Sequence, residues 1–469
     1  MTINGRICFF RSVWQPVFLS VFLLFFLIVK AHAGYLYLLN DDPAGSRIYG
    51  FQVNESTGAL TALTGFPLAT GGLGVNALVS ERMIADRANN RLYVINDGSN
   101  TVSAYSVNPA DGSITAMPFS PIMLDNATWN SINVHPSGSP VVVGDGSTTA
   151  GRVASFHITP TTATAATGSP YAMNPSSGFS SVFSRDGNYF YAGGNMGAVF
   201  AGFSVNPATG VLTPLVGSPF SSTTGNPVAH AMDSSGRLFV VTTTPEIRVF
   251  TTSSGIPTPV TGNPFSPGGL TQRRFGLIHQ TGNFYIVAGN SGNNVGVFQI
   301  AGTGAATTVT AVSGSPFGTG GTTANALALN QAGSFLYVAN RLSRNVTSFA
   351  FNSSTGALTG QTVQPSNTLG SAGFINGIAY FALPQITVSV GGRILTSDGQ
   401  PVSKAIVTMT DTQGATRTAL SSPFGYYEFK NVPVGETYTI SVFSKRFTFT
   451  PQNVFVNSEL TNFDITAQP

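Results

Sequence analysis

Short runs of large apolar residues return along the chain at a nearly constant interval, with turn-forming residues between them. Seven such runs follow one another, at residues 35–40, 92–96, 140–143, 189–192, 238–241, 284–287 and 336–340. Their starts lie about 46 to 57 residues apart, and β-branched and aromatic residues fill them. A period of this length, built from strands without helices, predicts the blades of a β-propeller.

Each repeat contains three further segments that we expect to be strands, which makes four strands per blade. A run of small residues such as 325–329 precedes the aromatic run, and segments such as 202–205 and 212–213 follow it. The turn before the aromatic run carries glycine or asparagine, because such a turn needs a residue at positive φ. These positions are Gly138, Gly187, Gly236, Gly282, Gly333 and the pair Asn89–Asn90. The pattern predicts an all-β fold, with a seven-bladed ring over residues 34–384.

The two ends of the repeat region are offset by one strand. The first repeat starts at Gly34 directly with its aromatic run, so it lacks the small-residue strand that opens the others. After the seventh repeat one segment is left over, Gly373–Tyr380. We expect this segment to supply the missing innermost strand of the first blade, because an open ring would expose two unpaired sheet edges.

A different pattern runs from Ile386 to the end of the chain. Alternating apolar residues at 386–394, a turn at 399–402, and runs at 405–409, 424–429 and 432–442 predict short strands. About seven strands in about 84 residues are typical of a β-sandwich. We therefore place a second domain, a C-terminal β-sandwich, at residues 385–469.

These runs resemble two known families. Tyr93–Asn96 and Tyr337–Asn340, with turns of the form Asn-Pro-x-Thr/Asp-Gly, resemble the YVTN-type, lactonase-like seven-bladed β-propellers. The order G-x-I, D-G-x-P-V, A-x-V, G-Y-Y-x-F and V-G-x-x-Y resembles the carboxypeptidase regulatory-like domain, a transthyretin-like sandwich. The first resemblance implies relatives of the phosphogluconolactonase type, and the second a usually non-catalytic appendage whose fold group includes carbohydrate binders. Both resemblances indicate fold more than activity, since propellers host many functions.

The N-terminus predicts export. A basic segment precedes an apolar run from Val17 to Val29, and Ala31–Ala33 fits a cleavage site, so residues 1–33 are predicted to be a secretory signal peptide. The alternative is a retained membrane anchor, although a span normally takes about 20 apolar residues. We expect a secreted, periplasmic or cell-surface protein without a stable membrane span after cleavage.

Cleavage changes the charge and cysteine content of the chain. Only 21 of the 469 residues are Lys or Arg and 18 are Asp or Glu. The predicted signal holds three of the bases, no acid and the one cysteine, Cys8, so the mature chain has 18 bases, 18 acids and no disulfide. A neutral chain without basic clusters is not expected to bind nucleic acid. We expect a monomer.

Side chains suited to catalysis are scarce. His135 and His279 sit where an innermost strand meets its turn and are expected to hydrogen-bond that turn, and His157 is expected to be structural. His230 lies within a small-residue run, where it is placed to face the central channel, and it is the one weak catalytic candidate. Histidine or cysteine pairs with metal-ligand spacing are lacking, so we expect neither a metal nor a cofactor.

Charged residues gather in segments that a propeller brings to one face of the ring. They belong to the loops after the aromatic runs and to the starts of the innermost strands. The predicted binding residues are Asp41, Asp42, Arg47, Glu81, Arg82, Asp97, Asp145, Arg152, Glu246, Arg273, Arg274, Arg341 and Arg344. The functional interpretation is a polar ligand site at the channel mouth. The alternative is that these are solvated charges of the kind that loops carry anyway.

Two functions compete on this evidence. Low charge and the lack of an identifiable nucleophile–base pair favour an exported, non-catalytic binding or scaffold protein, whose ring presents a surface to an unknown ligand, such as a glycan or a cell-surface protein. The alternative implied by the family resemblance is a lactonase-like hydrolase of a sugar lactone or related cyclic ester. It needs a general base and an electrophilic clamp, which His230 with Arg273, Arg274 or Glu81 would supply if they met at the channel mouth.

Overall fold

The computed structural model describes residues 33–469, apart from residues 80, 148–150, 174–176, 245, 272, 383–386, 412–413, 415 and 435 and the side chains of 33, 273 and 274. The predicted signal peptide, residues 1–33, lies outside the described residues except for Ala33. Strands make up nearly all of the regular structure, together with two short 3₁₀ helices, η1(Asp97–Ser99) and η2(Gly304–Ala306). The described residues contain no helix that is both long and apolar enough to cross a membrane.

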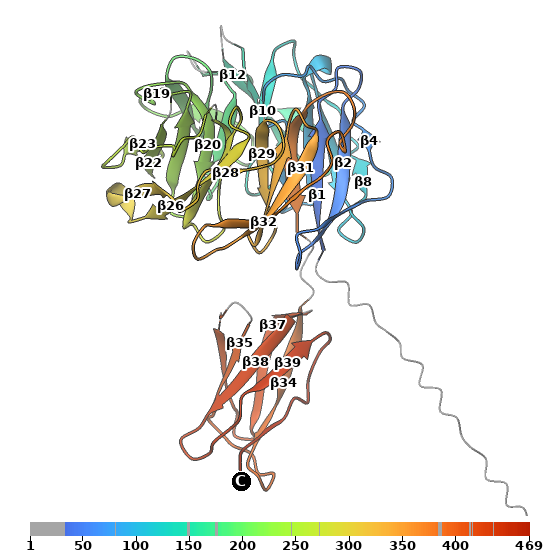
Figure 1. The fold of residues 1–469 in the computed structure, drawn as a ribbon, viewed down its shortest axis with the longest axis vertical. Coiled ribbons are helices and arrows are strands. Elements are labelled where there is room, and N and C mark those ends of the chain that lie inside the picture. Colours follow the sequence, from blue (N-terminus) through green and yellow to red (C-terminus); the bar gives the residue numbers. More distant parts are fainter. Residues whose placement is uncertain are drawn as a thin grey trace, which may run out of the picture.

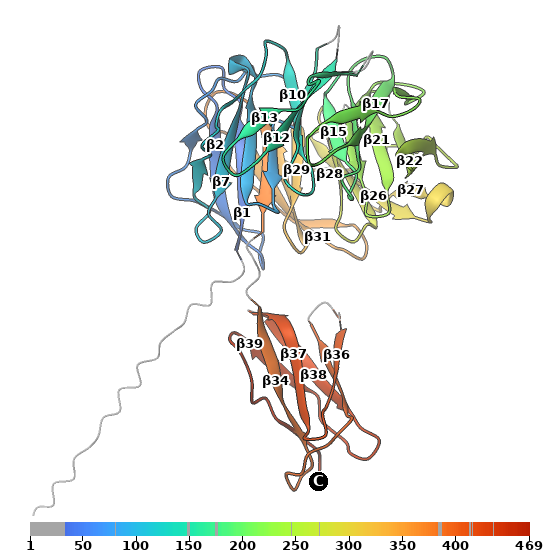
Figure 2. The same cartoon turned by 180° about the vertical axis from the view of Figure 1, so that it is seen from behind.

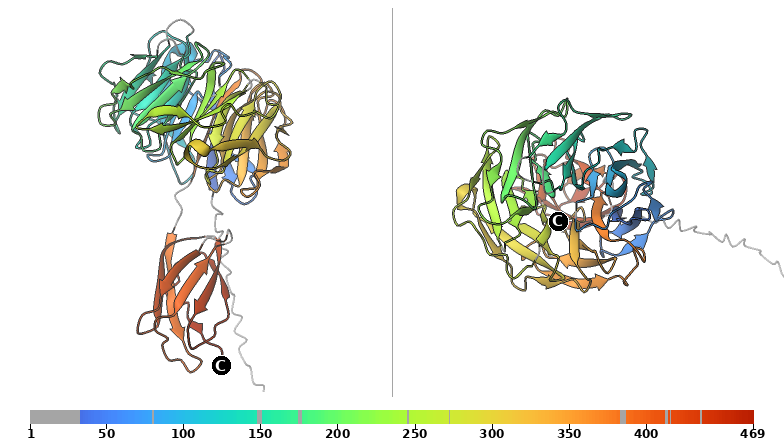
Figure 3. Two further views of the ribbon diagram at one scale, coloured as in Figure 1. Left: turned by 90° about the vertical axis from the view of Figure 1, so that its left-hand side faces the viewer. Right: turned by 90° about the horizontal axis from the view of Figure 1, so that it is seen from above.

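Within the described residues, seven antiparallel sheets stand around a common axis (Figure 3). From the axis outwards, each sheet has four main strands. The innermost strands of blades 1 to 7 are β33(Ile375–Phe381), β5(Met83–Asp86), β10(Trp129–Val134), β15(Ser180–Phe183), β20(Pro227–Met232), β24(Arg273–Ile278) and β29(Ala324–Leu329). The second strands are β1(Ala33–Asn40), β6(Arg91–Asn96), β11(Val141–Asp145), β16(Tyr189–Gly193), β21(Arg237–Thr242), β25(Phe284–Gly289) and β30(Phe335–Asn340).

The outer half of each blade is built in the same order (Figures 1 and 2). The third strands are β2(Arg47–Asn54), β7(Thr101–Val107), β12(Arg152–Ile158), β17(Val199–Val205), β22(Ile247–Ser253), β26(Asn294–Ala301) and β31(Asn345–Phe351). The fourth strands are β3(Leu60–Ala62), β8(Ile114–Ala116), β13(Ala163–Ala165), β18(Leu212–Pro214), β23(Ile256–Pro259), β27(Thr308–Ala311) and β32(Leu358–Val363). Five third strands also pair with two-residue strands, β4(Leu68–Ala69), β9(Ile122–Met123), β14(Tyr171–Ala172), β19(Phe220–Ser221) and β28(Phe317–Gly318). The predicted seven-bladed ring is confirmed.

The aromatic runs are the second strands, and they are buried on both faces. All six side chains of β25 and five of the six in β6 are buried. One face of each such strand packs on the preceding blade and the other on the following blade, so apolar clusters fill the space between neighbouring sheets. This packing explains why so little of the chain is charged, because charged side chains are rarely buried without a partner.

The ring closes as the offset of its ends predicts. β33 pairs with β1 in antiparallel register from Tyr35–Phe381 to Asn40–Ile375, so the last strand of the repeat region completes the first blade. The Tyr380 hydroxyl adds a hydrogen bond of 2.7 Å to Glu55. The predicted turn glycines are also confirmed, because Gly138, Gly187, Gly236, Gly282 and Gly333 have φ between 72° and 89°.

The second domain is a sandwich of two sheets, as its pattern predicts (Figures 1 and 2). One sheet has the order β37(Tyr426–Pro433), β34(Thr387–Leu395), β40(Ile465–Thr466), with β40 parallel to β34. The other has the order β36(Thr416–Leu420), β35(Ile406–Thr410), β38(Glu436–Phe443), β39(Gln452–Val456). Between the sheets lies an apolar core that includes Val407, Phe429 and Ile440.

Candidate functional site

The axial channel of the ring has two ends, and the strand directions decide which side chains reach each. At one end the innermost strands begin and the loops between second and third strands return; we call this end the loop face. At the other end the innermost strands finish and turn into the second strands; we call this end the turn face. All thirteen predicted binding residues belong to segments of the loop face.

Arg82 is the centre of a buried polar network at the loop face. Its two Nη atoms lie 2.7 Å from Asp41 Oδ2 and 2.6 Å from Asp97 Oδ2, and Nη2 also donates to Asn130 Oδ1 at 3.1 Å. The side chains of Arg82 and Asp41 are fully buried, and that of Asp97 is 4% exposed. Burial raises the pKa of Asp97, and the Arg82 charge acts in the opposite direction. Three residues predicted from sequence thus meet, but as a desolvated ion-pair cluster.

Residues 76–79, 81 and 82 spread this network across the mouth of the channel. Arg341, from blade 7, donates to the carbonyl oxygens of Asn76 and Ala77 at 2.8 and 3.1 Å. Asn325, from the same blade, donates to the carbonyl of Val79 at 2.7 Å. On the other side Glu81 reaches blade 4. Because residues 76, 77, 79 and 81 bond to blades two places away on either side of blade 2, they lie over the axis.

β-bulges supply the asparagines of this network. In β10, β29 and β33 the pairing register skips one residue near the start of the strand, and the skipped residues are Asn130, Asn325 and Asn376. A bulge turns an unpaired residue away from the ladder direction. Asn376 donates to Asp41 Oδ2 at 2.8 Å and to the carbonyl of Ala77 at 2.9 Å. Our sequence analysis did not predict these asparagines. The recurrence of asparagine near the start of three innermost strands would have indicated a shared position.

Glu81 is buried beside the network without a basic partner in the described contacts. Ser180 Oγ donates to its Oε1 at 2.6 Å, and the backbone N–H of Ser181 donates to its Oε2 at 3.1 Å. Burial raises its pKa from 4.5 to about 8, although both hydrogen bonds act to lower it. At neutral pH the raised pKa favours the protonated, uncharged form of Glu81.

Replacing Glu81 with Gln is expected to remove a pH-dependent loss of stability. Between about pH 4.5 and 8 the folded chain keeps the Glu81 proton and the unfolded chain releases it, so the free energy of unfolding falls as the pH rises. The slope is at most about 1.4 kcal/mol per pH unit. Urea unfolding at several pH values should show this slope in the wild type and a flatter one in Glu81→Gln. Glu428→Gln, at a half-exposed carboxylate, is the control, and a slope that survives Glu81→Gln would contradict the assignment.

The remaining predicted residues form local contacts at the loop face. Arg152 pairs with Asp145 at 3.2 Å and with Asp125 at 2.7 Å, and its guanidinium lies over Trp129. Glu246 pairs with Arg248 at 2.8 Å, and Arg344 donates to Asn367. Asp42 accepts from the backbone of Ala44, and Arg47 is exposed at the start of β2. Arg273 and Arg274 begin β24, and their side chains lie outside the described residues.

His230 is not placed for proton transfer. It is 4% exposed, its ring lies 5.9 Å from that of Phe200, and within the described residues neither ring nitrogen has a hydrogen-bond partner. Burial lowers its pKa to about 3. A catalytic base needs a partner and an accessible proton, so this geometry removes the one weak catalytic candidate from the site.

His135 and His279 hydrogen-bond turns, as expected. The Nε2 atom of each lies near the carbonyl of the turn glycine in the next blade, at 3.1 Å for Gly187 and 3.0 Å for Gly333. Their Nδ1 atoms lie 2.7 Å from Ser137 Oγ and 2.9 Å from Thr281 Oγ1. Both histidines therefore link consecutive blades at the turn face.

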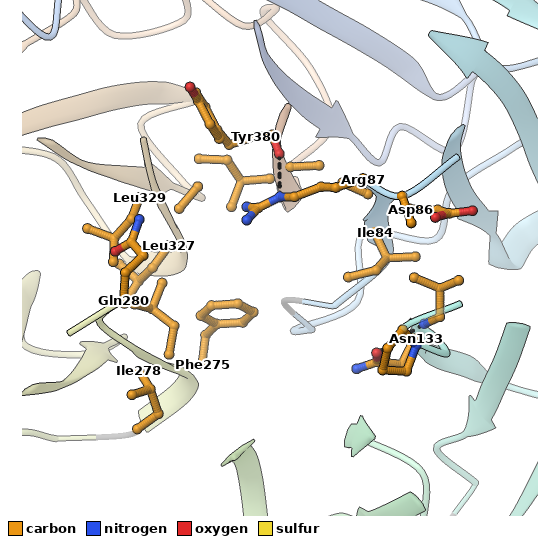
Figure 4. A pocket seen from close by; sticks show the side chains of 18 of the residues that line it. Ile84, Asp86, Arg87, Asn133, Phe275, Ile278, Gln280, Leu327, Leu329 and Tyr380 are labelled. Atoms are coloured by element: carbon orange, nitrogen blue, oxygen red, sulfur yellow. Dashed lines mark hydrogen bonds between the residues drawn. The ribbon is translucent and has the colours of Figure 1, made fainter. Parts of the chain in front are cut away.

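At the turn face the channel is an open cavity of about 580 Å³ (Figure 4). The ends of innermost strands from blades 1, 2, 3, 6 and 7 form its walls. Most of the lining is apolar, and its larger members are Ile84, Phe275, Leu277, Leu327, Leu329 and Ile378. A cavity of this size, mostly apolar and formed at the axis by five blades, is a candidate ligand site.

Arg87 brings a positive charge into this apolar cavity. Its side chain extends from the end of β5 towards blade 1, where Nε donates to the carbonyl of Tyr380 at 3.0 Å (Figure 4). Its guanidinium carbon lies 5.7 Å from the centre of the Tyr380 ring. Burial lowers the pKa of Arg87, but a guanidinium stays charged in proteins. Within the described residues its two Nη groups have no protein partner, so they remain available to a ligand.

Sequence reasoning missed Arg87 because it looked for charge in the loop-face segments. A comparison of equivalent positions between the repeats would have indicated it. Arg87 follows the residue that ends the innermost strand, and the equivalent position in blade 6 is Gln280, which also lines the cavity. The acid next to it, Asp86, accepts from Asn89 through both oxygens, at 3.1 and 3.0 Å, and points away from the cavity centre in Figure 4. In the described part of the chain, no three His, Cys, Asp or Glu side chains are grouped to hold a metal ion.

The sequence pattern of the family "Lactonase, 7-bladed beta-propeller" matches residues 38–229 and 237–369. The chain belongs to this lactonase family. The pattern of the "Carboxypeptidase regulatory-like domain" matches residues 389–468. No curated protein matches the chain. The lactonase-family ring also has similar solved structures, which share its fold at low sequence identity.

One of these structures is a proposed 6-phosphogluconolactonase of Bacteroides uniformis ATCC 8492, with a TM-score of 0.60 and 12% identity over 75% of this chain and 100% of that one. Another is the periplasmic gluconolactonase PpgL of Pseudomonas aeruginosa, with a TM-score of 0.57 and 15% identity over 75% of this chain and 99% of that one. The expectation of a non-catalytic binding or scaffold ring is corrected by the family match, which favours the lactonase-like alternative.

Proposed function

We propose that the ring hydrolyses a small lactone or related cyclic ester inside the axial cavity of the turn face. The observation that carries this proposal is the guanidinium of Arg87, whose Nη groups have no partner in the described residues, in a mostly apolar cavity at the axis of a lactonase-family ring. The predicted signal peptide adds that the reaction takes place outside the cytoplasm, in the periplasm, at the cell surface or in the medium.

The cavity suits the two halves of such a substrate. The hydrocarbon part of the ring would pack against Phe275, Leu329 and Ile378, and the ester carbonyl oxygen would accept hydrogen bonds from the Nη groups of Arg87. A positive charge acts more strongly where a bound substrate displaces water, and it stabilises the negative oxygen that forms when the carbonyl is attacked. Because Nε is held by Tyr380, the guanidinium is oriented before the substrate arrives.

The reaction follows from this placement. Water adds to the carbonyl carbon, the oxyanion is stabilised by Arg87, and the bond between the carbonyl carbon and the ring oxygen then breaks. The proton lost by the water goes to the ring oxygen, directly or through solvent, and the product is an open hydroxy acid. The carboxylate of Asp86 is bonded to Asn89 and takes no part in this scheme. The contribution of the protein is electrostatic stabilisation rather than general-base catalysis.

Arg87→Gln is expected to lower kcat/KM for lactone hydrolysis by about 100-fold, the loss that follows removal of one oxyanion donor. Arg87→Lys, which keeps the charge, should retain part of the activity. The measurement is the acid released from gluconolactone and from a panel of five- and six-membered lactones by the purified full chain. Arg185→Gln is the matched control, because Arg185 holds the equivalent position in blade 4 and does not line the cavity. Wild-type rates no higher than the uncatalysed ones, or an unaffected Arg87→Gln, would refute the proposal.

A further inference from the structure

The C-terminal sandwich carries a separate cavity of about 670 Å³. It lies between the loop that follows β34 and the loop that joins β38 to β39, and its lining includes residues 400–404 and 443–447. The chain enters this domain at Thr387, the start of β34, and the cavity lies at the other end of that strand. It therefore lies at the end of the domain opposite the start of β34.

Three positive charges line this cavity, and no acid does. They are Lys404, Lys445 and Arg446, half of the six basic residues between 386 and 469. All three are exposed, and within the described residues their side chains have no ion-pair or hydrogen-bond partner. The nearby acid Asp398 is bonded to Thr396 and lies outside the lining.

The other three bases of the domain all have partners. Arg417 donates to the carbonyl of Asn431 at 3.1 Å, and Lys430 lies 3.7 Å from Glu428. Arg393 lies over the ring of Tyr426. The domain as a whole is neutral, with six bases and six acids, but its three unpaired bases all lie at this cavity.

Large apolar side chains stand exposed beside these charges. Phe443 is 64% exposed and Phe447 is 38% exposed. Phe443 lies directly opposite Ile406 across β38 and β35, and Ile406 lies opposite Leu420, so the three form one row on the outer face of the sheet. A contiguous exposed apolar row of this kind marks a contact surface. Ser403, Ser444 and Gln400 add hydroxyl and amide groups to the lining.

We propose that this cavity binds an acidic saccharide, a glycan whose sugar rings carry carboxylate or sulfate groups. The face of a sugar ring is apolar and packs on phenylalanine, its hydroxyls match serine and glutamine, and its acid groups match lysine and arginine. Free cations without a competing acid give the site its preference for anions. An anionic membrane would instead need basic and apolar groups on a protruding surface, and this site is concave. The proposal concerns a different domain from the lactone site and is independent of it.

The test is the affinity of the full chain for polygalacturonate, compared with dextran of equal length, by isothermal titration calorimetry. The wild type is expected to bind polygalacturonate and not dextran, and to bind more weakly as NaCl is raised. Lys404→Ser, Lys445→Ser and Arg446→Ser in one chain should weaken the binding about tenfold or more, and Phe443→Ser should weaken it too. All four side chains are exposed, so the urea midpoint of the sandwich should not change.

Lys430→Ser is the matched control, because it removes one positive charge from the same domain outside the cavity and should leave the affinity unchanged. Equal affinity for dextran and polygalacturonate, or unchanged binding in the triple variant, would overturn the proposal. A third outcome would also overturn it. In that outcome no glycan binds, and the three bases instead bind vesicles of phosphatidylglycerol and phosphatidylcholine or a poly-glutamate peptide. Loss of glycan binding with intact lactone turnover, or the reverse, separates this proposal from the function proposed for the ring.

Discussion

A chain that ends after Ala372 is expected to lose cooperative unfolding of the ring. It lacks β33, so the inner edge of β1 has no partner over the register from Tyr35 to Asn40. The apolar clusters on both sides of the first blade also lose Ile375, Tyr380 and Phe381, each at most 2% exposed. Burying side chains of this size stabilises a fold by about 1.5 to 3 kcal/mol each. The sum is comparable with the whole stability of an ordinary domain, about 5 to 15 kcal/mol.

A chain that ends after Ala382 is the control for this truncation. It also lacks the C-terminal sandwich but keeps β33, so it should unfold in one cooperative transition near the midpoint of the ring in the full chain. Circular dichroism during thermal and urea unfolding distinguishes the two chains, and binding of a hydrophobic dye reports the exposed edge. Equal cooperativity in both would show that the ring does not depend on its closing strand.

The second large effect concerns the network at the loop face. Arg82→Met is expected to lower the free energy of unfolding by about 3 to 5 kcal/mol, because it leaves two buried carboxylates without their cation. Asp41 and Asp97 lie 2.7 and 2.6 Å from the Arg82 guanidinium, and water does not reach them to replace it. The lost stability should return in part when Asp41→Asn and Asp97→Asn are added to Arg82→Met, since both uncompensated charges are then removed.

Urea unfolding at neutral pH measures this effect, and Arg47→Met is its control. Arg47 is an exposed base of the same face, at the start of β2, and its replacement should change the free energy of unfolding by no more than about 0.5 kcal/mol. A loss for Arg82→Met no larger than that for Arg47→Met would mean that the buried ion pairs contribute little net stability. The first blade would then be held to its neighbours mainly by apolar packing.

Much of the fold could be predicted from the sequence because the strands and turns of each blade are encoded by residues within one repeat. The turns at the repeated glycines require positive φ, which glycine adopts readily. The aromatic runs are apolar at successive positions, and this predicts strands that are buried on both faces. The closing strand was predictable for a different reason. The repeat at Gly34 begins one strand late, and the segment after residue 372 has the composition of the strand that is missing. Both arguments rest on neighbours in sequence or on comparison between repeats.

The site could be predicted less well because it depends on contacts across the ring. Arg82, Asp41 and Asp97 lie at one face of the ring as predicted, but the path of residues 76–79 over the axis is decided by bonds to Arg341 and Asn325, more than 240 residues away. The same path buries the charges that were expected to face a ligand. Arg87 lies on the opposite face of the ring, outside the segments in which the charged binding residues were predicted. Which end of a channel is open is a property of packing and not of composition.

The closing pair of strands also decides how the ring bears a load. The pairing of β1 with β33 begins at Tyr35–Phe381, where β33 ends, so the chain enters and leaves the ring at the same end of one antiparallel pair of strands. A force that pulls these two strand ends apart therefore breaks the backbone hydrogen bonds between β1 and β33 one pair after another. It does not load all of them at once, as a force along the strands would. If the sandwich holds the protein on a polymer, the tension reaches the ring through β33 only. The start of β1 is then not pulled, and the hydrogen bonds between β1 and β33 are not separated. Attachment at both ends would make the first blade the mechanical weak point of the whole ring.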